Sequence, residues 1–251
     1  MAWAGELAER RPLHHGRRCQ RRISLIRTLR GVKNLLVPDH TKYRKIRFGP
    51  ARGGWLPINL RHHFRMLWGL YEREIRSTIT SLVRPGDRCY DIGSADGYYT
   101  VALARLASPD GWVCGIDADE RLAETLRHTV VRNTHLLSHI EIISAMLGSE
   151  VDRTRRQDTF DHLVFERGYP LPQFIKCDIE GGEYGVLRGA ARTIARASPR
   201  LLIEVHAAAT EQDCVEFLRG HGYRLTIIDR STFLPEVRPL PHNRWLCAVK
   251  A

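Results

Sequence analysis

The sequence Tyr-Asp-Ile-Gly-Ser-Ala-Asp-Gly, at residues 90–97, decides the fold that we expect for this chain. Apolar residues predict a buried strand over 88–92 and a helix over 97–107. Gly93 and Gly97 suit a backbone that turns sharply while another group presses against it, because glycine has no Cβ atom. The helix that follows would point unpaired N–H groups at the occupant of the turn.

A second acidic residue, Asp117, stands at the carboxyl end of the next predicted strand, 112–117. A strand, a glycine turn, a helix, a strand and an acid are typical of the nucleoside-binding half of a doubly wound α/β sheet, where the acid accepts hydrogen bonds from ribose hydroxyls. The spacing is Asp-x-Gly-x-x-x-Gly and not the Gly-x-Gly-x-x-Gly of dinucleotide sites. It favours S-adenosylmethionine over NAD. The predicted cofactor-binding residues are Asp91, Gly93, Ser94, Asp96, Gly97 and Asp117.

The composition is that of a globular protein. The chain has 251 residues, of which 43% are hydrophobic, so it can bury a substantial core. It contains no apolar run of the roughly 18 to 20 residues that span a bilayer, and no signal-peptide core. Its six cysteines are scattered without a Cys-x-x-Cys pair, which indicates reduced thiols. We therefore expect a cytoplasmic protein, associated at most with the surface of a membrane.

The positive charge is concentrated in the N-terminal arm, residues 1–52. This arm holds 14 lysine and arginine residues against 3 acidic residues, whereas the remainder of the chain is neutral. Apolar residues at three- and four-residue spacing over 18–37 predict a basic amphipathic helix, which could contact an anionic membrane or an RNA backbone. The alternatives are a solvated extension that packs one apolar stripe on the core, and an organelle transit peptide.

Apolar patterning predicts the remaining elements. The helical spacing of 64–82 predicts one helix that packs against the sheet, after a short extended piece at 55–60. The segment 145–170 is expected to be a loop with a short helix near 159–164. The other predicted elements are helix 119–133, strand 139–144, a strand from 174 to 178, a helix that ends before Pro199, strand 200–206, helix 211–219, and strands 223–228 and 244–249.

The second informative stretch is Phe-Ile-Lys-Cys-Asp-Ile-Glu-Gly-Gly-Glu, residues 174–183. It places Asp178, Glu180 and Glu183 at the carboxyl end of a strand, the edge where open α/β sheets bind ligands. The alternative is that Glu183 only stabilises a helix N-terminus and that Glu180 is solvated. For Asp178 we favour a functional role.

Taken together, the motifs resemble the FkbM family of class I S-adenosylmethionine-dependent methyltransferases. The resemblance rests on Ile-Lys-x-Asp-x-Glu-Gly-x-Glu (175–183) followed by Val-Leu-x-Gly-Ala (186–190). Gly-Leu-Tyr-Glu at 69–72, Gly-Tyr-Tyr-Thr at 97–100 and Leu-Leu-Ile-Glu-Val-His at 201–206 support it. The sequence departs from the family pattern at Asp96, and Ile-Asp-Ala-Asp at 116–119 replaces the common Phe-Glu-Pro.

This resemblance implies a Rossmann-like fold with a seven-stranded, mostly parallel sheet, an antiparallel last strand and helices on both faces. Charge and composition divide the chain into a basic arm (1–52) and a helical segment that packs on the core (53–85), and the resemblance makes 86–251 a methyltransferase domain. The implied cofactor is S-adenosylmethionine, and the implied partner is a hydroxylated small-molecule or glycan acceptor.

Methyl transfer is an in-line displacement, so the enzyme must align the acceptor and exclude water. A hydroxyl acceptor also benefits from a base. The catalytic candidates are Asp178, His206, Glu204 and Glu180; a hydrogen-bonded histidine in a strand-end turn is the alternative for His206. We expect no obligatory metal, although a carboxylate cluster would prefer Mg²⁺ to zinc. The predicted function is O-methylation of a small molecule, glycan or lipid-linked sugar; the alternative is a nucleic-acid-binding or RNA-modifying methyltransferase that uses the basic arm.

Overall fold

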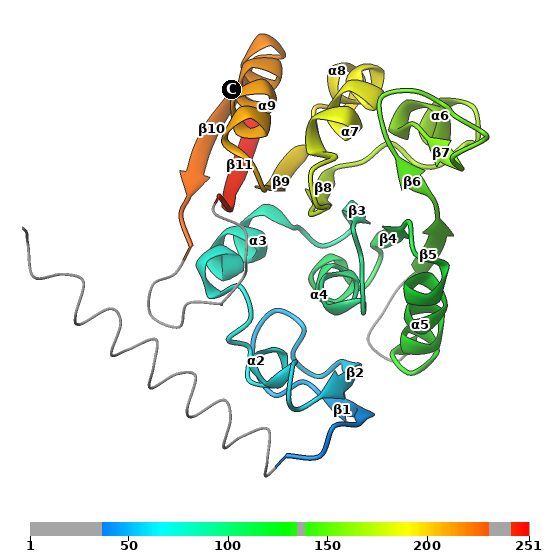
Figure 1. The fold of residues 1–251 in the computed structure, drawn as a ribbon, viewed down its shortest axis with the longest axis vertical. Helices are drawn as coiled ribbons and strands as arrows, with labels where there is room; N and C mark the ends of the chain where they lie inside the picture. Colours follow the sequence, from blue (N-terminus) through cyan, green and yellow to red (C-terminus); the bar gives the residue numbers. More distant parts are fainter. Residues whose placement is uncertain (1–36, 135–138, 231–241, 251) are drawn as a thin grey trace, which may run out of the picture.

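A seven-stranded sheet forms the centre of the computed structural model, which describes residues 37–134, 139–230 and 242–250 (Figure 1). The strand order is β10-β11-β9-β8-β3-β4-β5. All neighbouring strands from β9 to β5 are parallel, and β11 is antiparallel to both of its neighbours. The strands are β3 (Arg88–Ile92), β4 (Trp112–Asp117), β5 (His139–Ser144), β8 (Phe174–Cys177), β9 (Arg200–Val205), β10 (Tyr223–Ile228) and β11 (Arg244–Lys250). The predicted fold class is therefore confirmed.

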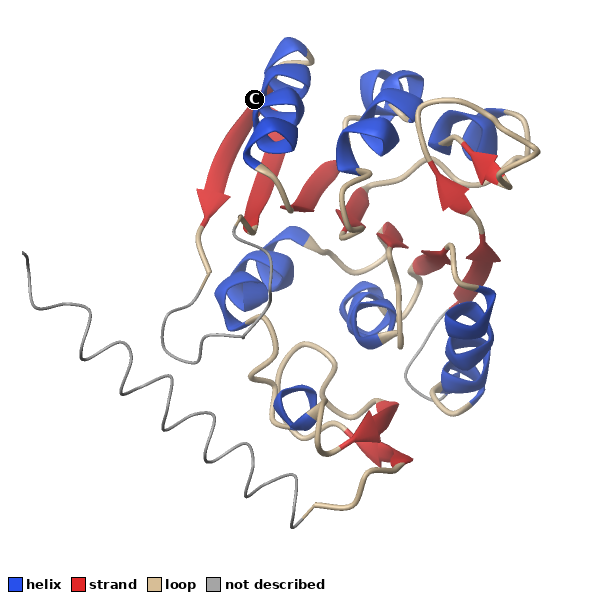
Figure 2. Cartoon of the chain, in the orientation of Figure 1, coloured by secondary structure: helices blue, strands red, loops and turns tan. Residues whose placement is uncertain are grey.

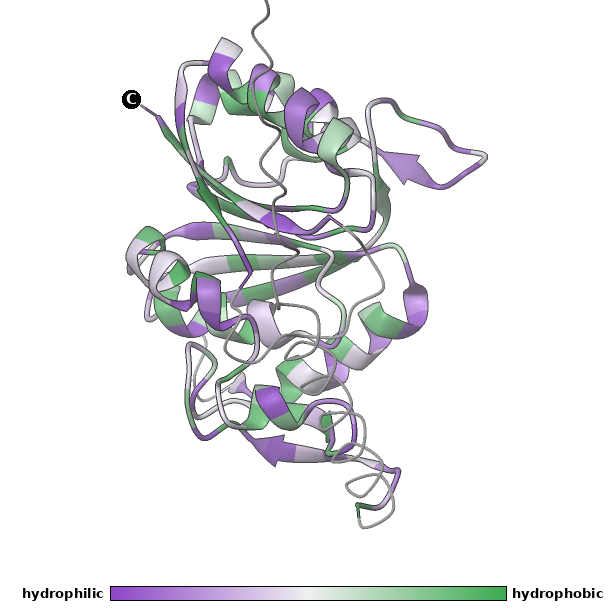
Figure 3. Ribbon diagram, turned by 60° about the vertical axis from the view of Figure 1, so that its left-hand side comes forward, coloured by the Kyte–Doolittle hydropathy of each residue, from purple (hydrophilic) through white to green (hydrophobic). Residues whose placement is uncertain are grey.

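Helices cover both faces of this sheet (Figures 1 and 2). One face carries α3 (Arg76–Leu82), α4 (Tyr98–Ala107) and α5 (Glu120–Val131). The other carries α6 (Phe160–Phe165), α7 (Glu183–Gly189), α8 (Ala191–Ala197) and α9 (Ala208–Gly220). Because both faces are buried, most residues of the central strands are apolar (Figure 3). No helix in the described ranges is long and apolar enough to cross a membrane.

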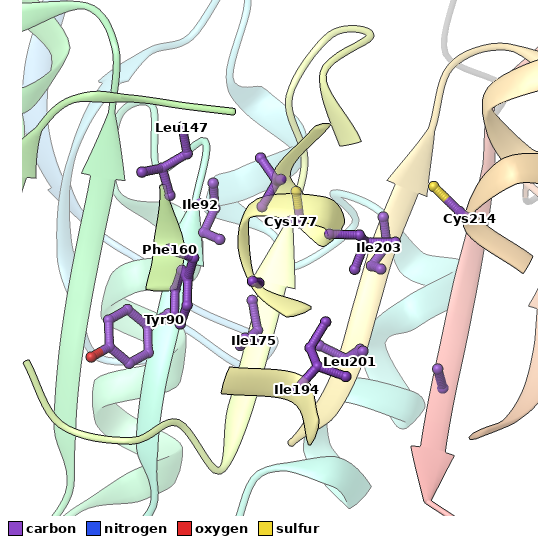
Figure 4. Close-up of a cluster of buried hydrophobic side chains, with 14 of the residues drawn as sticks. Tyr90, Ile92, Leu147, Phe160, Ile175, Cys177, Ile194, Leu201, Ile203 and Cys214 are labelled. Atoms are coloured by element: carbon purple, nitrogen blue, oxygen red, sulfur yellow. The ribbon is translucent and has the colours of Figure 1, made fainter. Parts of the chain in front are cut away.

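The core between the sheet and α6 to α9 is close-packed (Figure 4). Tyr90 of β3 is fully buried and meets Phe160 edge to face, with 4.8 Å between the ring centroids. Its hydroxyl donates a 2.6 Å hydrogen bond to the carbonyl oxygen of Pro170. This aromatic side chain therefore contributes its apolar area to the core without leaving a polar atom unsatisfied.

The prediction of one continuous helix over 64–82 is wrong. The chain forms α2 (Phe64–Leu67), a 3₁₀ turn η1 (Arg73–Ile75) and then α3. Gly69 has φ +63°, and a Cβ atom there would lie 2.5 Å from the backbone carbon of Phe48. Glu72 also adopts a left-handed conformation, with φ +42°. These two residues turn the chain. Helical spacing alone did not reveal the turn, because Ile75 and Ile79 are buried as a continuous helix would have them.

The boundary predicted after residue 52 falls inside a compact hairpin. Strand β1 (Thr41–Lys45) pairs with β2 (Trp55–Asn59) in antiparallel register. Ile46 and Ala51, in the connection, are fully buried. Residues 41–59 therefore form one packed unit. Most of the amphipathic helix predicted over 18–37 lies outside the described residues.

Two further differences concern the half of the chain after β5. The segment 145–170 contains two short paired strands, β6 (Met146–Leu147) and β7 (Gln157–Asp158), besides the expected helix α6. The helix after β8 divides into α7 and α8. It divides beside Gly189, where a Cβ atom would lie 2.0 Å from the carbonyl oxygen of Gly148. Gly189 thus lets α7 pack directly on the end of β6.

Candidate active site

A cavity of about 770 Å³ lies at the carboxyl ends of the parallel strands. Its walls include Gly93 after β3, Asp117 of β4, Asp178 after β8 and His206 after β9. Tyr71, which precedes η1, closes one side. Ligands of open α/β sheets bind at this edge, at the point where the strand order reverses, and the volume suits a nucleotide-sized ligand.

The glycine turn is held in place by close packing on both sides. Gly93 has φ +78°, and a Cβ atom there would lie 1.9 Å from the carbonyl oxygen of Asp178. Gly97 has φ +86°, and a Cβ atom would lie 2.3 Å from Cδ1 of Leu126 in α5. These glycines therefore join β3 closely to β8 and to α5. The sequence predicted close approach at both glycines, and the structure shows that the approaching groups include the backbone of Asp178 and the side chain of Leu126.

Asp117 borders the cavity with a fixed carboxylate. Its Oδ2 accepts a 2.8 Å hydrogen bond from the backbone N–H of Ala95, in the glycine turn. Its Oδ1 accepts a 2.9 Å bond from the backbone N–H of Asp119. The end of β4 and the glycine turn are thereby tied together, in the position expected for a ribose-binding acid.

The other predicted cofactor residues do not line the cavity. Asp91 is fully buried and accepts a 2.7 Å hydrogen bond from Oγ1 of Thr100. Ser94 is also buried. Asp96 lies 3.7 Å from Nε2 of His63, and burial raises the pKa of its carboxyl above the ordinary value. Asp91, Ser94, Asp96 and Gly97 therefore support the turn, while Gly93 and Asp117 reach the cavity.

His206 is oriented by Glu183. Its Nδ1 lies 2.6 Å from Oε1 of Glu183, and both side chains are buried. Its Nε2 lies 3.8 Å from Oδ1 of Asp178 and 3.7 Å from Oε2 of Glu204. A carboxylate that accepts a hydrogen bond from Nδ1–H fixes the tautomer of a neutral histidine, so Nε2 becomes the proton acceptor. The structure thus brings together three of the four catalytic candidates.

The fourth candidate, Glu180, stands apart from this cluster. It lines the cavity from the exposed loop between β8 and α7. The carboxylate that contacts Nδ1 of His206 is instead that of Glu183. It is fully buried in the first turn of α7. The sequence placed it at the ligand-binding edge, with a helix-terminal role as the alternative, and did not identify it as a partner of His206. The missed signal is that Glu183 and His206 both belong to the motifs of the family resemblance.

Lys176 is a second residue that the sequence argument missed. Its Nζ lies 3.3 Å from Oδ1 of Asp91 and 3.5 Å from Oδ2 of Asp178, and the side chain is buried. Burial alone would lower the pKa of this ammonium group, but Asp91 and Asp178 raise it above the ordinary value. The sequence did contain a signal for this pairing, because Lys176 stands between two apolar residues of a predicted strand. A lysine buried in a strand is almost always paired with an acidic residue.

The same cluster offers donors to a metal ion. One ligand atom each of Asp178, Glu204 and His206 lie within 4.8 Å of one another. Two carboxylates and an imidazole suit a divalent cation of the first transition row. The charged ammonium group of Lys176 lies beside Asp178, however, and would repel such an ion.

The fold is similar to that of solved class I methyltransferases. The methyltransferase FkbM of Methylobacillus flagellatus has a TM-score of 0.54 with this structure, at 18% sequence identity, and the match covers 93% of this chain and 60% of that one. The M. jannaschii protein TYW2, solved in complex with AdoMet, has a TM-score of 0.50 at 12% identity, over 85% and 87% of the two chains. At these identities the likeness shows the fold.

Sequence comparison finds a partial match to a known family. The family model of the methyltransferase FkbM domain matches residues 150–225, which contain β8, α7 and His206. The resemblance to the FkbM family that the motifs indicated is therefore confirmed over this part of the chain. It is also 30% identical over 94 residues to the demethylmenaquinone methyltransferase of Symbiobacterium thermophilum. That match covers 38% of this chain, and the chain spans about a third (35%) of the length of that relative.

Proposed function

We propose that this chain is an S-adenosylmethionine-dependent O-methyltransferase that acts on a hydroxyl group of a small molecule, a glycan or a lipid-linked sugar. The observation that carries the proposal is the contact between Glu183 and His206, which directs Nε2 toward Asp178 at the wall of the cavity. Such a pair is suited to removing a proton from a hydroxyl.

The cavity fits the cofactor. S-adenosylmethionine supplies an activated methyl group on a sulfonium sulfur. Asp117 is placed to accept hydrogen bonds from ribose hydroxyls. Ile116, Ala118 and Leu122 line the same part of the cavity and offer an apolar wall to the adenine ring. The glycine turn at Gly93 allows the backbone to approach the ligand.

His206 then acts as the general base. Glu183 accepts a hydrogen bond from Nδ1–H and stabilises the imidazolium that forms when Nε2 takes the proton of the acceptor hydroxyl. The hydroxyl oxygen would then form its bond to the methyl carbon as the bond from that carbon to the sulfonium sulfur breaks, and S-adenosylhomocysteine would be the leaving group. Asp178, 3.8 Å from Nε2, is close enough to orient the same hydroxyl by accepting a hydrogen bond. The buried position of His206 and Glu204 keeps bulk water away from this step.

The second candidate function is methylation of RNA. It is favoured by the basic surface of the described part of the arm, where Lys42, Lys45, Arg47 and Arg52 are exposed. Phosphate backbones bind such surfaces with a strong dependence on salt. The buried proton acceptor at the cavity favours the hydroxyl of a smaller acceptor, and we therefore rank RNA second.

The test is transfer of labelled methyl groups by the full chain into fractionated cell extract. We expect label in a fraction that is stable to nuclease and to alkali, since a methyl ether survives alkali whereas a methyl ester does not. His206→Gln should abolish the transfer while calorimetry still detects binding of S-adenosylhomocysteine. Label that nuclease releases would favour the RNA candidate. Absence of cofactor binding in the wild-type protein would refute the proposal as a whole.

A further inference from the structure

Exposed aromatic side chains are concentrated in one short segment. Among the described residues, the phenylalanine and tryptophan side chains that are exposed all lie within residues 48–68. They are Phe48, Trp55, Phe64 and Trp68, with exposed fractions of 52%, 37%, 47% and 43%. Single exposed apolar residues are ordinary, whereas a group of large rings marks a surface that is buried in some interaction.

Three of these rings lie side by side and form what we call the aromatic patch: Phe48, Phe64 and Trp68. Phe48 and Trp68 are stacked, with 5.8 Å between centroids and 18° between ring planes. Phe64 lies 6.2 Å from Trp68. The backbone N–H of Arg47 donates a 3.0 Å hydrogen bond to the carbonyl oxygen of Leu67. The two segments that carry the rings are therefore fixed against each other.

The surroundings of the patch are strongly basic. Residues 37–68 hold seven lysine and arginine residues and one acidic residue, Asp39. Arg47, next to Phe48 in the chain, and Lys45, three residues before it, are exposed. The preceding residues, 1–36, hold nine basic and two acidic residues. Opposite charges attract, so the complementary occupant of this basic surface is anionic.

The patch is joined directly to the glycine turn of the candidate active site. His63, next to Phe64, places its Nε2 3.7 Å from Oδ2 of Asp96 in that turn. Gly49, next to Phe48, is so close to α4 that a Cβ atom would lie 3.1 Å from the hydroxyl oxygen of Tyr98. A surface bound by the patch would therefore lie beside the part of the molecule that forms the cofactor site.

We propose that the aromatic patch and the cations around it dock this protein on an anionic lipid surface. Phenylalanine and tryptophan rings enter the interface between headgroups and acyl chains, while lysine and arginine bind the phosphates. Single-stranded RNA is the less suitable partner, because bases stack on open ring faces and two of the three rings already face each other. The inference does not depend on the proposed function.

The experiment is flotation of the full chain with phosphatidylcholine vesicles, with and without phosphatidylglycerol. We expect binding only to the anionic vesicles and weaker binding at high salt. The double variant Phe64→Ser, Trp68→Ser should bind about tenfold more weakly, equivalent to about 1.4 kcal/mol. The matched control is Val131→Ser, Ile227→Ser, which changes two exposed apolar residues elsewhere and should bind as the wild type does. Equal melting temperatures verify that the variants fold.

A second measurement identifies the inserted ring. Brominated lipid should quench part of the tryptophan fluorescence, and Trp68→Phe should remove that part while vesicle binding persists. Residues 1–36 are unchanged in all variants. If the patch variant binds vesicles as strongly as the wild type does, the contact belongs to those residues and the proposal is overturned. Absence of vesicle binding would also overturn it, as would RNA binding that the patch variant loses.

Discussion

Oε1 of Glu183 lies 2.6 Å from Nδ1 of His206, a contact between two side chains that are 23 residues apart in the sequence. Glu183 stands in the first turn of α7, and His206 follows β9. Because adjacent parallel strands end at the same edge of the sheet, β8 and β9 bring these residues together. The pair gives His206 a defined orientation at the wall of the cavity, and the first prediction follows from it.

Glu183→Gln should lower the methyl-transfer rate by roughly tenfold to 10²-fold, because the amide no longer stabilises the imidazolium. Loss of the negative charge also disfavours the protonated ring, so the acidic limb of the pH–rate profile should move to lower pH. The measurement is kcat against pH for the variant and the wild type. The exposed residue Glu150 supplies the control, since Glu150→Gln should leave the profile unchanged. If the pH–rate profile of Glu183→Gln equals that of the wild type, the role of Glu183 is structural only.

Asp178→Asn should lower the rate by roughly 10²-fold or more, while affinity for the cofactor stays near that of the wild type. The substitution keeps the shape of the side chain and removes the charge that lies between Lys176 and His206. Thermal unfolding and single-turnover kinetics measure the two effects separately. If the variant is less stable but turns over normally, Asp178 is part of the scaffold and His206 acts without it.

Asp117→Ala should weaken binding of S-adenosylmethionine by about 1 to 3 kcal/mol, as expected for hydrogen bonds to a charged group. The same carboxylate also holds the N–H groups of Ala95 and Asp119, so some loss of stability is expected too. Asp119→Ala is the matched control. It removes the cap of α5, whose carboxylate accepts from the N–H of Arg121, and costs about 1 kcal/mol of stability without reaching the cavity. Calorimetry that finds equal cofactor affinity for both variants would contradict the ribose assignment.

Local signals were enough to predict the sheet and the location of the cavity. The strand after Asp87 and the turn at Gly93 were predictable, because an apolar run and a glycine determine the conformation of their own segment of the chain. The break at Gly69 and Glu72 was not predictable in this way. Its cause is the approach of the Phe48 backbone, which the helical spacing of 64–82 does not contain.

The candidate site was only partly predictable, for a related reason. Asp178 and His206 were identified because each ends a strand of the predicted sheet. Lys176 and Glu183 acquire their roles from partners on other elements, Asp91 for the lysine and His206 for the glutamate. Such pairings depend on which strands are neighbours in space, and a single sequence does not state the strand order.

Gly93→Ala should be far more harmful than Gly86→Ala, although both glycines have nearly the same positive φ, +78° and +81°. At Gly86 nothing lies within 4 Å of the added Cβ atom, so the cost is the backbone conformation alone, about 1 to 2 kcal/mol. At Gly93 the Cβ atom would lie 1.9 Å from the carbonyl oxygen of Asp178, and overpacking adds about 1 to 3 kcal/mol. Denaturant unfolding of the two variants isolates the steric part. If both variants lose the same free energy of unfolding, the contact between the turn after β3 and the residue after β8 is looser than the 1.9 Å approach implies.

The last prediction concerns the possibility of a metal at Asp178, Glu204 and His206. The carboxylates around Lys176 hold its pKa above the ordinary value of 10.5 against the opposing effect of burial. Its ammonium group therefore stays charged at neutral pH, and the stability that it contributes is present below pH 10.5 and lost as the pH rises above that value.

A divalent ion at Asp178 would have to share that carboxylate with Lys176, whose Nζ is 3.5 Å away. Repulsion between the two cations opposes binding in a site with little water. We therefore expect that exhaustive chelation changes kcat by less than about twofold and that Mn²⁺ does not raise the melting temperature, as a ligand of the folded state would. The matched variant is Glu204→Gln, which removes one donor and should behave in the same way toward chelator and Mn²⁺. Activity that chelation abolishes and Mn²⁺ restores in the wild type, but not in Glu204→Gln, would show that the cluster is a metal centre and that the proton of the acceptor leaves by another route than His206.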